Sequence, residues 1–295
     1  MPEISRRHML AAGTAGVAGF AVVATQAAQA NQNSPAPQVS ANPNGRFADK
    51  VVLITGATSG IGEVTARAFA AEGATVHFCG RREALGEQIA QSIRATGGRA
   101  TYQKADVRIE DDVKAFVDGC LERYGQLDIA FNNAGIFVPT SATVADTDVA
   151  AWNDVMTTNA SGVFYSMKYE LPPMVRQQSG VIINNASVSG HVAFGTISPY
   201  TASKHAIIGL TKVAAVEYAA QNIRVNSISP GAVDTPQLAQ GLRIFGATPE
   251  QAAQGYPIKR IVAPQEIASV VMWLSESSSC VVGTDIDVTG GYLTH

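Results

Sequence analysis

The chain of 295 residues is long enough for one large α/β domain or two small ones, and its 46% hydrophobic and 15% charged residues are ordinary for a globular protein. A formal net charge of -3 gives no support for nucleic acid or an anionic membrane surface as a partner. The three cysteines, Cys79, Cys120 and Cys280, are scattered and odd in number, so we expect neither a metal site nor a disulfide framework.

Residues 1–30 have the pattern of an export signal and not of a folded element. Arg6 and Arg7 supply a basic segment, an apolar run rich in Ala and Gly covers residues 10–25, and a small-x-small cleavage pattern stands at residues 28–30. The run is too short and too weakly hydrophobic to predict a membrane span, so we expect no membrane partner for the mature chain. A disordered alanine-rich tail is the alternative interpretation.

Residues 31–46 are rich in Pro, Asn and Ser and predict a flexible linker. From residue 47 onward, short apolar runs alternate with longer helical patterns. The expected strands are residues 50–55, 75–79, 100–105, 127–132, 181–186, 223–228 and 285–288. Several lack polar alternation, as strands covered on both faces do, and the spacers have room for crossover helices. The sequence therefore predicts one α/β domain over residues 47–295, a Rossmann-type, doubly wound, parallel seven-stranded sheet.

A glycine-rich turn follows the first expected strand. In the sequence TGATSGIGEV, Gly56, Gly60 and Gly62 form a G-x-x-x-G-x-G pattern ahead of an Ala-rich helix. Glycines permit a tight turn and close backbone approach, and the helix N-terminus presents N–H groups to an anion. Because the pattern follows the first strand of a βαβ repeat, it predicts a cradle for the pyrophosphate of a dinucleotide.

The end of the second expected strand bears on which dinucleotide binds. An acidic residue there would hold the ribose 2′-hydroxyl of NAD, yet Cys79 and Gly80 are followed by Arg81 and Arg82. A guanidinium suits a 2′-phosphate through charge-assisted hydrogen bonds. The pattern favours NADP(H), with NAD(H) as the alternative if both arginines are merely a solvated helix start.

The chemistry centres on Tyr200 and Lys204, which are one turn apart on one face of an expected helix. A nearby ammonium lowers the pKa of a phenol and makes it a usable acid or base near neutral pH. Ser187 follows the fifth expected strand, at the edge where open α/β sheets bind ligands, and its hydroxyl can donate to a substrate oxygen.

These motifs together resemble the classical subfamily of the short-chain dehydrogenases/reductases over residues 47–295. The matching pieces are Thr55-Gly56-x-x-x-Gly60-Ile61-Gly62, Asp106, Asn132-Asn133-Ala134-Gly135, Asn159, Ser187, Tyr200-x-x-x-Lys204 and Pro230-Gly231. The resemblance implies a reversible hydride transfer between NADP(H) and an alcohol or ketone, for which the cofactor supplies the hydride chemistry.

The resemblance also implies roles for single residues. Tyr200 would donate or accept the proton, Ser187 would polarise the carbonyl, Lys204 would lower the Tyr200 pKa and hold the ribose, and Asn159 would order a water that relays protons. Asp106 would contact the adenine and Thr235 the nicotinamide carboxamide. The implied nucleotide-binding residues are Gly56, Ser59, Gly60, Ile61, Gly62, Arg81, Arg82, Asp106, Val107, Asn133, Ala134, Gly135, Tyr200, Lys204, Pro230, Gly231, Val233 and Thr235.

Phe137, His191, Phe194, Phe245 and Tyr256 are plausible linings of a substrate pocket, although core or loop packing would explain each equally well. The family resemblance implies a homotetramer or homodimer. A catalytically quiet dinucleotide-binding sensor or scaffold is the alternative to the enzyme.

The stretch from Ser5 to Leu10, Ser-Arg-Arg-x-x-Leu, resembles the twin-arginine (Tat) export signal, with Met9 and Ala11 in place of the usual Phe and Lys. That route carries folded proteins, so the resemblance implies a periplasmic enzyme that leaves the cell with its nucleotide bound. A cytoplasmic location is the alternative.

Overall fold

The computed structural model describes residues 40–138, 142–276 and 280–294. The chain divides into Met1–Gln38 and one compact unit, Val39–His295. The expected signal segment of residues 1–30 therefore lies outside the described residues, as does most of the expected linker. No helix of the described part is long and apolar enough to cross a membrane.

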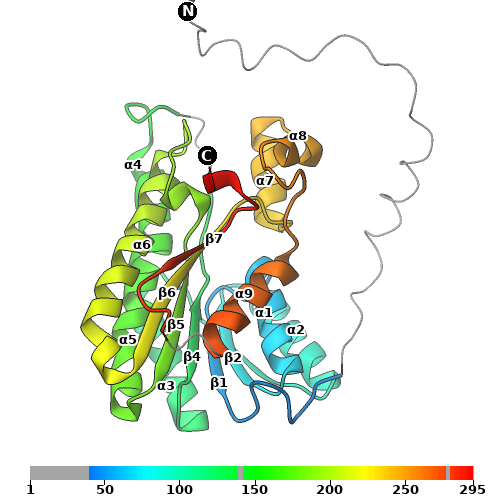
Figure 1. Ribbon diagram of the computed structural model, residues 1–295, viewed down its shortest axis with the longest axis vertical. Helices are drawn as coiled ribbons and strands as arrows, with labels where there is room; N and C mark the ends of the chain where they lie inside the picture. The colour runs from blue at the N-terminus through cyan, green and yellow to red at the C-terminus, as the bar shows by residue number, and fades with distance from the viewer. Residues whose placement is uncertain (1–39, 139–141, 277–279, 295) are drawn as a thin grey trace, which may run out of the picture. The chain divides into compact units, whose positions relative to one another are not determined.

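The compact unit is built on a parallel seven-stranded sheet with the strand order β3-β2-β1-β4-β5-β6-β7 (Figure 1). Every neighbouring pair is parallel, which confirms the predicted sheet. The strands are β1 (Val51–Ile54), β2 (Thr75–Gly80), β3 (Arg99–Lys104), β4 (Ile129–Asn132), β5 (Gly180–Asn185), β6 (Ile223–Pro230) and β7 (Asp285–Val288).

Helices cover both faces of the sheet, as Figure 1 shows. One face carries α1 (Gly60–Ala71), α2 (Glu83–Ala95) and α9 (Pro264–Glu276), and the other carries α3 (Glu110–Tyr124), α5 (Gly162–Gln177) and α6 (Ser198–Tyr218). The remaining helices are α4 (Val149–Met156), η2 (Thr157–Ser161), η3 (Val188–Gly190), η4 (Ala219–Gln221), α7 (Pro236–Phe245), α8 (Pro249–Gln254) and η5 (Tyr292–Thr294).

Two apolar layers hold the helices to the sheet. In β1, Val52 and Ile54 belong to the layer under α1, α2 and α9, whereas Val51 and Leu53 belong to the opposite layer. Successive side chains of a strand point to opposite faces, so an all-apolar strand supplies both layers. This explains why the central strands lack polar alternation.

The last part of the expected linker is attached to the domain. Backbone N–H groups of Ala41 and Asn42 donate to the carbonyls of Thr96 and Ala71, at 2.9 and 2.8 Å. Arg46 pairs with Glu72 at 3.1 Å. Residues 41–46 therefore belong to the packed unit, which corrects the linker boundary at residue 46, because their backbone groups find partners at the ends of α1 and α2.

The strand order changes direction between β1 and β4. Chain order runs outward from β1 to β3 on one side and from β4 to β7 on the other. Connections on the two sides turn away from each other at such a point, which leaves a crevice outside the carboxyl ends of the strands. A ligand site is therefore expected at this edge.

Candidate active site

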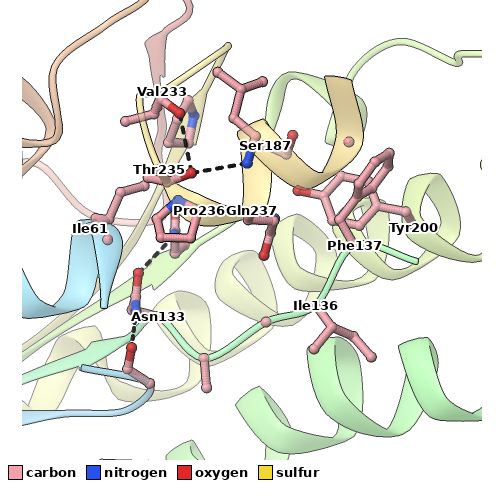
Figure 2. A pocket seen from close by; sticks show the side chains of 18 of the residues that line it. Ile61, Asn133, Ile136, Phe137, Ser187, Tyr200, Val233, Thr235, Pro236 and Gln237 are labelled. Carbon is pink, nitrogen blue, oxygen red and sulfur yellow. Dashed lines mark hydrogen bonds between the residues drawn. The ribbon is translucent and has the colours of Figure 1, made fainter. Parts of the chain in front are cut away.

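A cavity of about 880 Å³ lies at this edge. Its walls come from the β1–α1 turn, the ends of β2, β4, β5 and β6, and the first turns of α6 and α7. Figure 2 shows Asn133, Ile136 and Phe137 on the segment after β4, with Tyr200 on α6 and Thr235 at the start of α7. Sequence-distant segments thus meet at one opening.

The glycine-rich turn has the geometry that its sequence predicts. Gly56 and Gly60 have φ angles of 69° and 60°, which favour glycine, and a Cβ at Gly56 would lie 2.6 Å from Ala134 Cα. Gly62 lies in α1, where a Cβ would stand 2.5 Å from the Asn133 amide nitrogen. Within the described residues, no side chain caps the first turn of α1. Its N–H groups are thus available to an anion, and the cradle fits a pyrophosphate.

The end of β2 has no room for an acidic side chain. A Cβ at Gly80 would lie 2.7 Å from Thr58 Cγ2. The Arg82 guanidinium donates to Thr58 Oγ1 at 2.9 Å and to Ser59 Oγ at 2.6 Å, so it braces the glycine-rich turn. Arg81 is exposed on the cavity wall, and no side chain of the described part is hydrogen-bonded to it. The guanidinium N–H groups of Arg81 are therefore available to a ligand, whereas those of Arg82 already donate to Thr58 and Ser59.

Asp106 lines the cavity after β3, and its carboxylate is engaged by a residue that sequence reasoning missed. Arg108 donates to both carboxylate oxygens, at 3.0 and 2.6 Å, and also bonds Asp154. Burial opposes ionisation of Asp106, but these hydrogen bonds lower its carboxyl pKa below the usual value. The sequence signal that could have predicted this ion pair is the presence of an arginine two residues after the aspartate. Asp106, the residue that is expected to contact the adenine, is therefore a carboxylate that is already paired with Arg108.

Ser187, Tyr200 and Lys204 lie together at the other end of the cavity. Lys204 Nζ is 5.5 Å from the centre of the Tyr200 ring and donates to the Asn185 carbonyl at 2.7 Å. Ser187, at the N-cap of η3, is buried, and it lies close enough to Tyr200 to lower the pKa of the phenol. The three side chains come from the end of β5 and one face of α6, as the sequence predicts.

The pKa values of this group differ from the expectation. Burial raises the pKa of Tyr200, and the nearby Ser187 hydroxyl only partly opposes that rise. Burial also lowers the pKa of Lys204 to about 7. Burial thus opposes the lowering of the Tyr200 pKa that Lys204 is expected to cause, and that role of Lys204 stays a prediction.

Asn159 lies behind the cavity wall and is wholly buried. It stands in the π-helical turn η2, a kind of bulge that is frequent at functional sites. Its Oδ1 accepts from the Ile136 N–H at 2.8 Å, and its Nδ2 donates to the Ile136 carbonyl and to Ser203 Oγ, both at 3.0 Å. A Cβ at Gly135 would lie 3.4 Å from Asn159 Oδ1 and 3.7 Å from Lys204 Nζ, so the two side chains border the same glycine.

The wall of the cavity around Tyr200 is mainly aromatic. Phe137 meets the Tyr200 ring edge-on at 5.0 Å and lies 6.2 Å from Phe245. Tyr256 covers Gly231, where a Cβ would lie 2.6 Å from its ring. Of the charged side chains that line the cavity, Arg81, Arg82 and Asp106 lie at the nucleotide end and Lys204 beside the tyrosine.

Comparisons with known proteins place the chain in a family. The family model described as "Enoyl-(Acyl carrier protein) reductase" matches residues 56–293. The cyclohexanol dehydrogenase of Acinetobacter sp. (strain SE19) is 38% identical over 248 residues, which cover 84% of this chain and 96% of that protein. The chain is a short-chain dehydrogenase/reductase. It is an oxidoreductase of the alcohol dehydrogenase and carbonyl reductase type, and its fold binds a nicotinamide dinucleotide.

Other relatives agree with this assignment. The levodione reductase of Leifsonia aquatica is 38% identical over 260 residues, which cover 85% of this chain and 97% of that protein. A crystal structure of levodione reductase superimposes with a TM-score of 0.80 at 36% identity, covering 83% of this chain and 98% of that one. ElxO with NADP bound gives 0.78 at 29% identity, with coverages of 83% and 99%.

The short-chain dehydrogenase/reductase gathers nearly all the residues that its sequence predicts for the site. All the predicted catalytic and nucleotide-binding residues line the cavity except Gly62 and Asn159, which stand directly behind its wall. Of the plausible linings, His191 does not line it, because its Nε2 pairs with Asp285 at 2.7 Å. Reasoning from the sequence missed the linings Ile136, Val188, Gln237, Leu238 and Leu242, which are apolar or amide side chains with no motif of their own.

Proposed function

We propose that this enzyme interconverts an uncharged alcohol and its ketone with NADP(H), and that Ser187, Tyr200 and Lys204 carry the proton chemistry. The observation that carries the proposal is their convergence at one end of a cavity whose other end holds the glycine-rich cradle and Arg81. The bound nucleotide would supply or accept the hydride.

The polar groups suit the reduction of a carbonyl. Tyr200, whose pKa is raised by burial, holds the proton that a developing alkoxide needs. The Ser187 hydroxyl, which lies beside the phenol, donates to the same oxygen as charge develops. Lys204 would bind the ribose hydroxyls of the nucleotide, and its pKa of about 7 allows it to exchange a proton near neutral pH. The role of Asn159 in ordering a relay water stays a prediction.

The choice of NADP(H) over NAD(H) rests on the end of β2. An acidic side chain is absent at Gly80 and a Cβ there meets Thr58, whereas the exposed Arg81 can bind a 2′-phosphate. NADP in the related structure of ElxO is consistent with this choice. NAD(H) is the alternative.

The substrate class that fits the cavity is a cyclic alcohol or ketone. Aromatic rings on several sides, with Lys204 beside Tyr200 as the charged side chain among the described linings at this end, suit an apolar ring with one oxygen substituent. The names of the cyclohexanol dehydrogenase and the levodione reductase support the same class.

The experiment is turnover of cyclohexanol and cyclohexanone with either nucleotide. We expect Tyr200→Phe to lower kcat/KM at least about a hundredfold, the usual range for loss of a general acid, with NADPH affinity unchanged. Tyr165→Phe, on α5 outside the cavity, is the matched control. Near-wild-type turnover by Tyr200→Phe would refute the mechanism, and NADPH binding without turnover across a carbonyl panel would favour the quiet sensor.

We also propose a homotetramer or homodimer formed through α4, α5 and α6. These helices expose Trp152, Phe164, Val213 and Val216, at 39%, 48%, 56% and 85%, and a second copy of the chain is the partner that would cover them. Native mass spectrometry of the wild type and of Val216→Glu tests this. An oligomer that survives the substitution with unchanged dissociation would point to another surface.

We propose, finally, that residues 1–30 direct export of the folded enzyme through the twin-arginine route. The support is the Ser-Arg-Arg-x-x-Leu pattern and the need of this fold to be complete before it binds a dinucleotide. Cell fractionation of the wild type against a variant with Arg6→Lys and Arg7→Lys tests the route. Equal retention of both proteins in the cytoplasm would refute the twin-arginine route. Cleaved periplasmic enzyme that never contains nucleotide would refute export with the cofactor bound.

A further inference from the structure

A second polar cluster lies beneath the cavity, wholly inside the protein. Glu170 on α5, Asn132 at the end of β4, Asn184 on β5 and Thr211 on α6 are each at most 1% exposed. Asn132 Nδ2 donates to Glu170 Oε2 and to Asn184 Oδ1, both at 3.0 Å. Asn184 Nδ2 donates to Thr211 Oγ1 at 2.9 Å. The cluster thus ties two helices to two neighbouring strands.

The cluster is adjacent in sequence to groups that form the site. Asn132 and Asn184 are directly opposite in the sheet, and each is followed by an asparagine of the cavity wall. Asn185 donates from its side chain to Asn133 Oδ1 at 3.1 Å, and its carbonyl accepts from Lys204 Nζ. A shift between the ends of β4 and β5 would therefore move the Lys204 contact and the nucleotide wall together.

Among the residues that the structure describes, no cation faces Glu170. From β2 and α3 the titratable neighbours are Cys79 and Cys120, both neutral thiols, since burial raises their pKa values to about 12. From α3, Glu110 also lies along α5, but Lys168 and Tyr169 engage it at the surface. The groups that β4, β5 and α6 present are the amides and the hydroxyl described above, which do not titrate, and the residues of η2 do not titrate either.

The hydrogen bonds also favour a protonated carboxyl. Glu170 Oε1 and Asn132 Oδ1 are buried with no hydrogen-bond partner among the described residues. Both are acceptors when Glu170 is ionised, whereas a proton converts one of them to a donor. Burial raises the pKa of Glu170 to about 8, against the pull of the Asn132 hydrogen bond.

We propose that Glu170 is a positioning residue that works as a neutral carboxylic acid and, through Asn132 and Asn184, fixes the strand ends that carry the Lys204 contact and the nucleotide wall. The inference rests on the proposed function for its readout, because the ligand of that wall is taken to be NADPH. When Glu170 loses its proton, a buried uncompensated charge appears between α5 and the sheet, and the strand ends separate to admit water.

The test is NADPH affinity as a function of pH for the wild type and Glu170→Gln, with the exposed Glu217→Gln as control. Between about pH 7 and about pH 9, the neutral fraction of a group with a pKa of about 8 falls to about a tenth. Over this interval the wild type and the control should therefore lose up to about tenfold more NADPH affinity than Glu170→Gln loses. Glu170→Met also removes the oxygen that accepts from Asn132, so this variant should bind NADPH weakly at every pH. The amide oxygen of Glu170→Gln keeps that acceptor and should preserve NADPH binding. Parallel curves for wild type and Glu170→Gln would overturn the inference.

A second readout needs no ligand. The folded pKa of Glu170 lies above its ordinary value of about 4.5, so its contribution to stability is present at low pH and is lost as pH rises to about 8. The urea midpoint of the wild type should therefore fall relative to Glu170→Gln over that interval and stay level above it. Failure of NADPH to bind any variant near neutral pH would refute the proposed function, whereas equal pH dependence of the midpoints would refute a neutral Glu170.

Discussion

Replacement of Arg81 by alanine should change nucleotide choice without changing the fold. Arg81 is exposed, lines the nucleotide end of the cavity and has no hydrogen-bonded side chain among the described residues. Its guanidinium can therefore give its donors to a 2′-phosphate without breaking a contact. Arg82, in contrast, already donates to Thr58 and Ser59. The two arginines should therefore respond differently to the same substitution.

The magnitude follows from the nature of the contact. A hydrogen bond to a charged group contributes about 1.5–3 kcal/mol, and solvent screening at an exposed side chain favours the lower end. About 1.4 kcal/mol is tenfold in a dissociation constant, so Arg81→Ala should weaken NADPH about tenfold and leave NADH unchanged. Arg82→Ala should weaken both nucleotides by the same factor, because it loosens the shared turn.

The assay is titration of nucleotide fluorescence on the purified enzyme at low and high salt. Arg176→Ala, an exposed arginine in the last turn of α5, controls for the loss of one positive charge. The NADPH effect of Arg81→Ala should shrink as salt rises, since screening weakens an exposed charge contact. A wild type that binds NADH and NADPH equally, or an Arg81→Ala variant that loses both equally, would refute the reasoning.

Other substitutions test the packing of the site and of the core. Gly62→Ala should abolish detectable NADPH binding, because its Cβ would stand 2.5 Å from Asn133 Nδ2 within the cradle; calorimetric titration that finds wild-type affinity would contradict this. Gly241→Val should raise KM for bulky ring ketones more than for cyclohexanone, because a Cβ there already lies 3.0 Å from the Phe137 ring; a uniform change across ring sizes would argue against that wall. Ile182→Ala, at a wholly buried position of β5, should lower the free energy of unfolding by about 2–5 kcal/mol in urea titrations, and a loss below about 1 kcal/mol would mean that the core repacks.

The parts of the fold that the sequence predicts are those written in local patterns. All-apolar runs such as β1 must be covered on both faces, and glycines that follow such a run fix a turn whatever surrounds them. Tyr200 and Lys204 are likewise predictable, because helical spacing alone puts them on one face.

The features of the site that the sequence does not predict depend on contacts between segments that are distant in the chain. The pairing of Arg108 with both Asp106 and Asp154 needs α4 to approach the end of β3. The π-helical turn at Asn159 needs the backbone of Ile136 beside it. The upward shift of the Tyr200 pKa needs burial, which spacing does not report. Each follows from tertiary packing that overrides a local expectation.

The attachment of residues 41–46 has a practical consequence for handling the protein. These residues bond the far ends of α1 and α2, and Arg46 pairs with Glu72 and Glu276. Since α1 begins at the cavity, its end lies at the opposite edge of the sheet. An affinity tag, a fusion partner or a proteolytic cut ahead of residue 40 thus joins the domain about a full helix length, ~18 Å, from the chemistry.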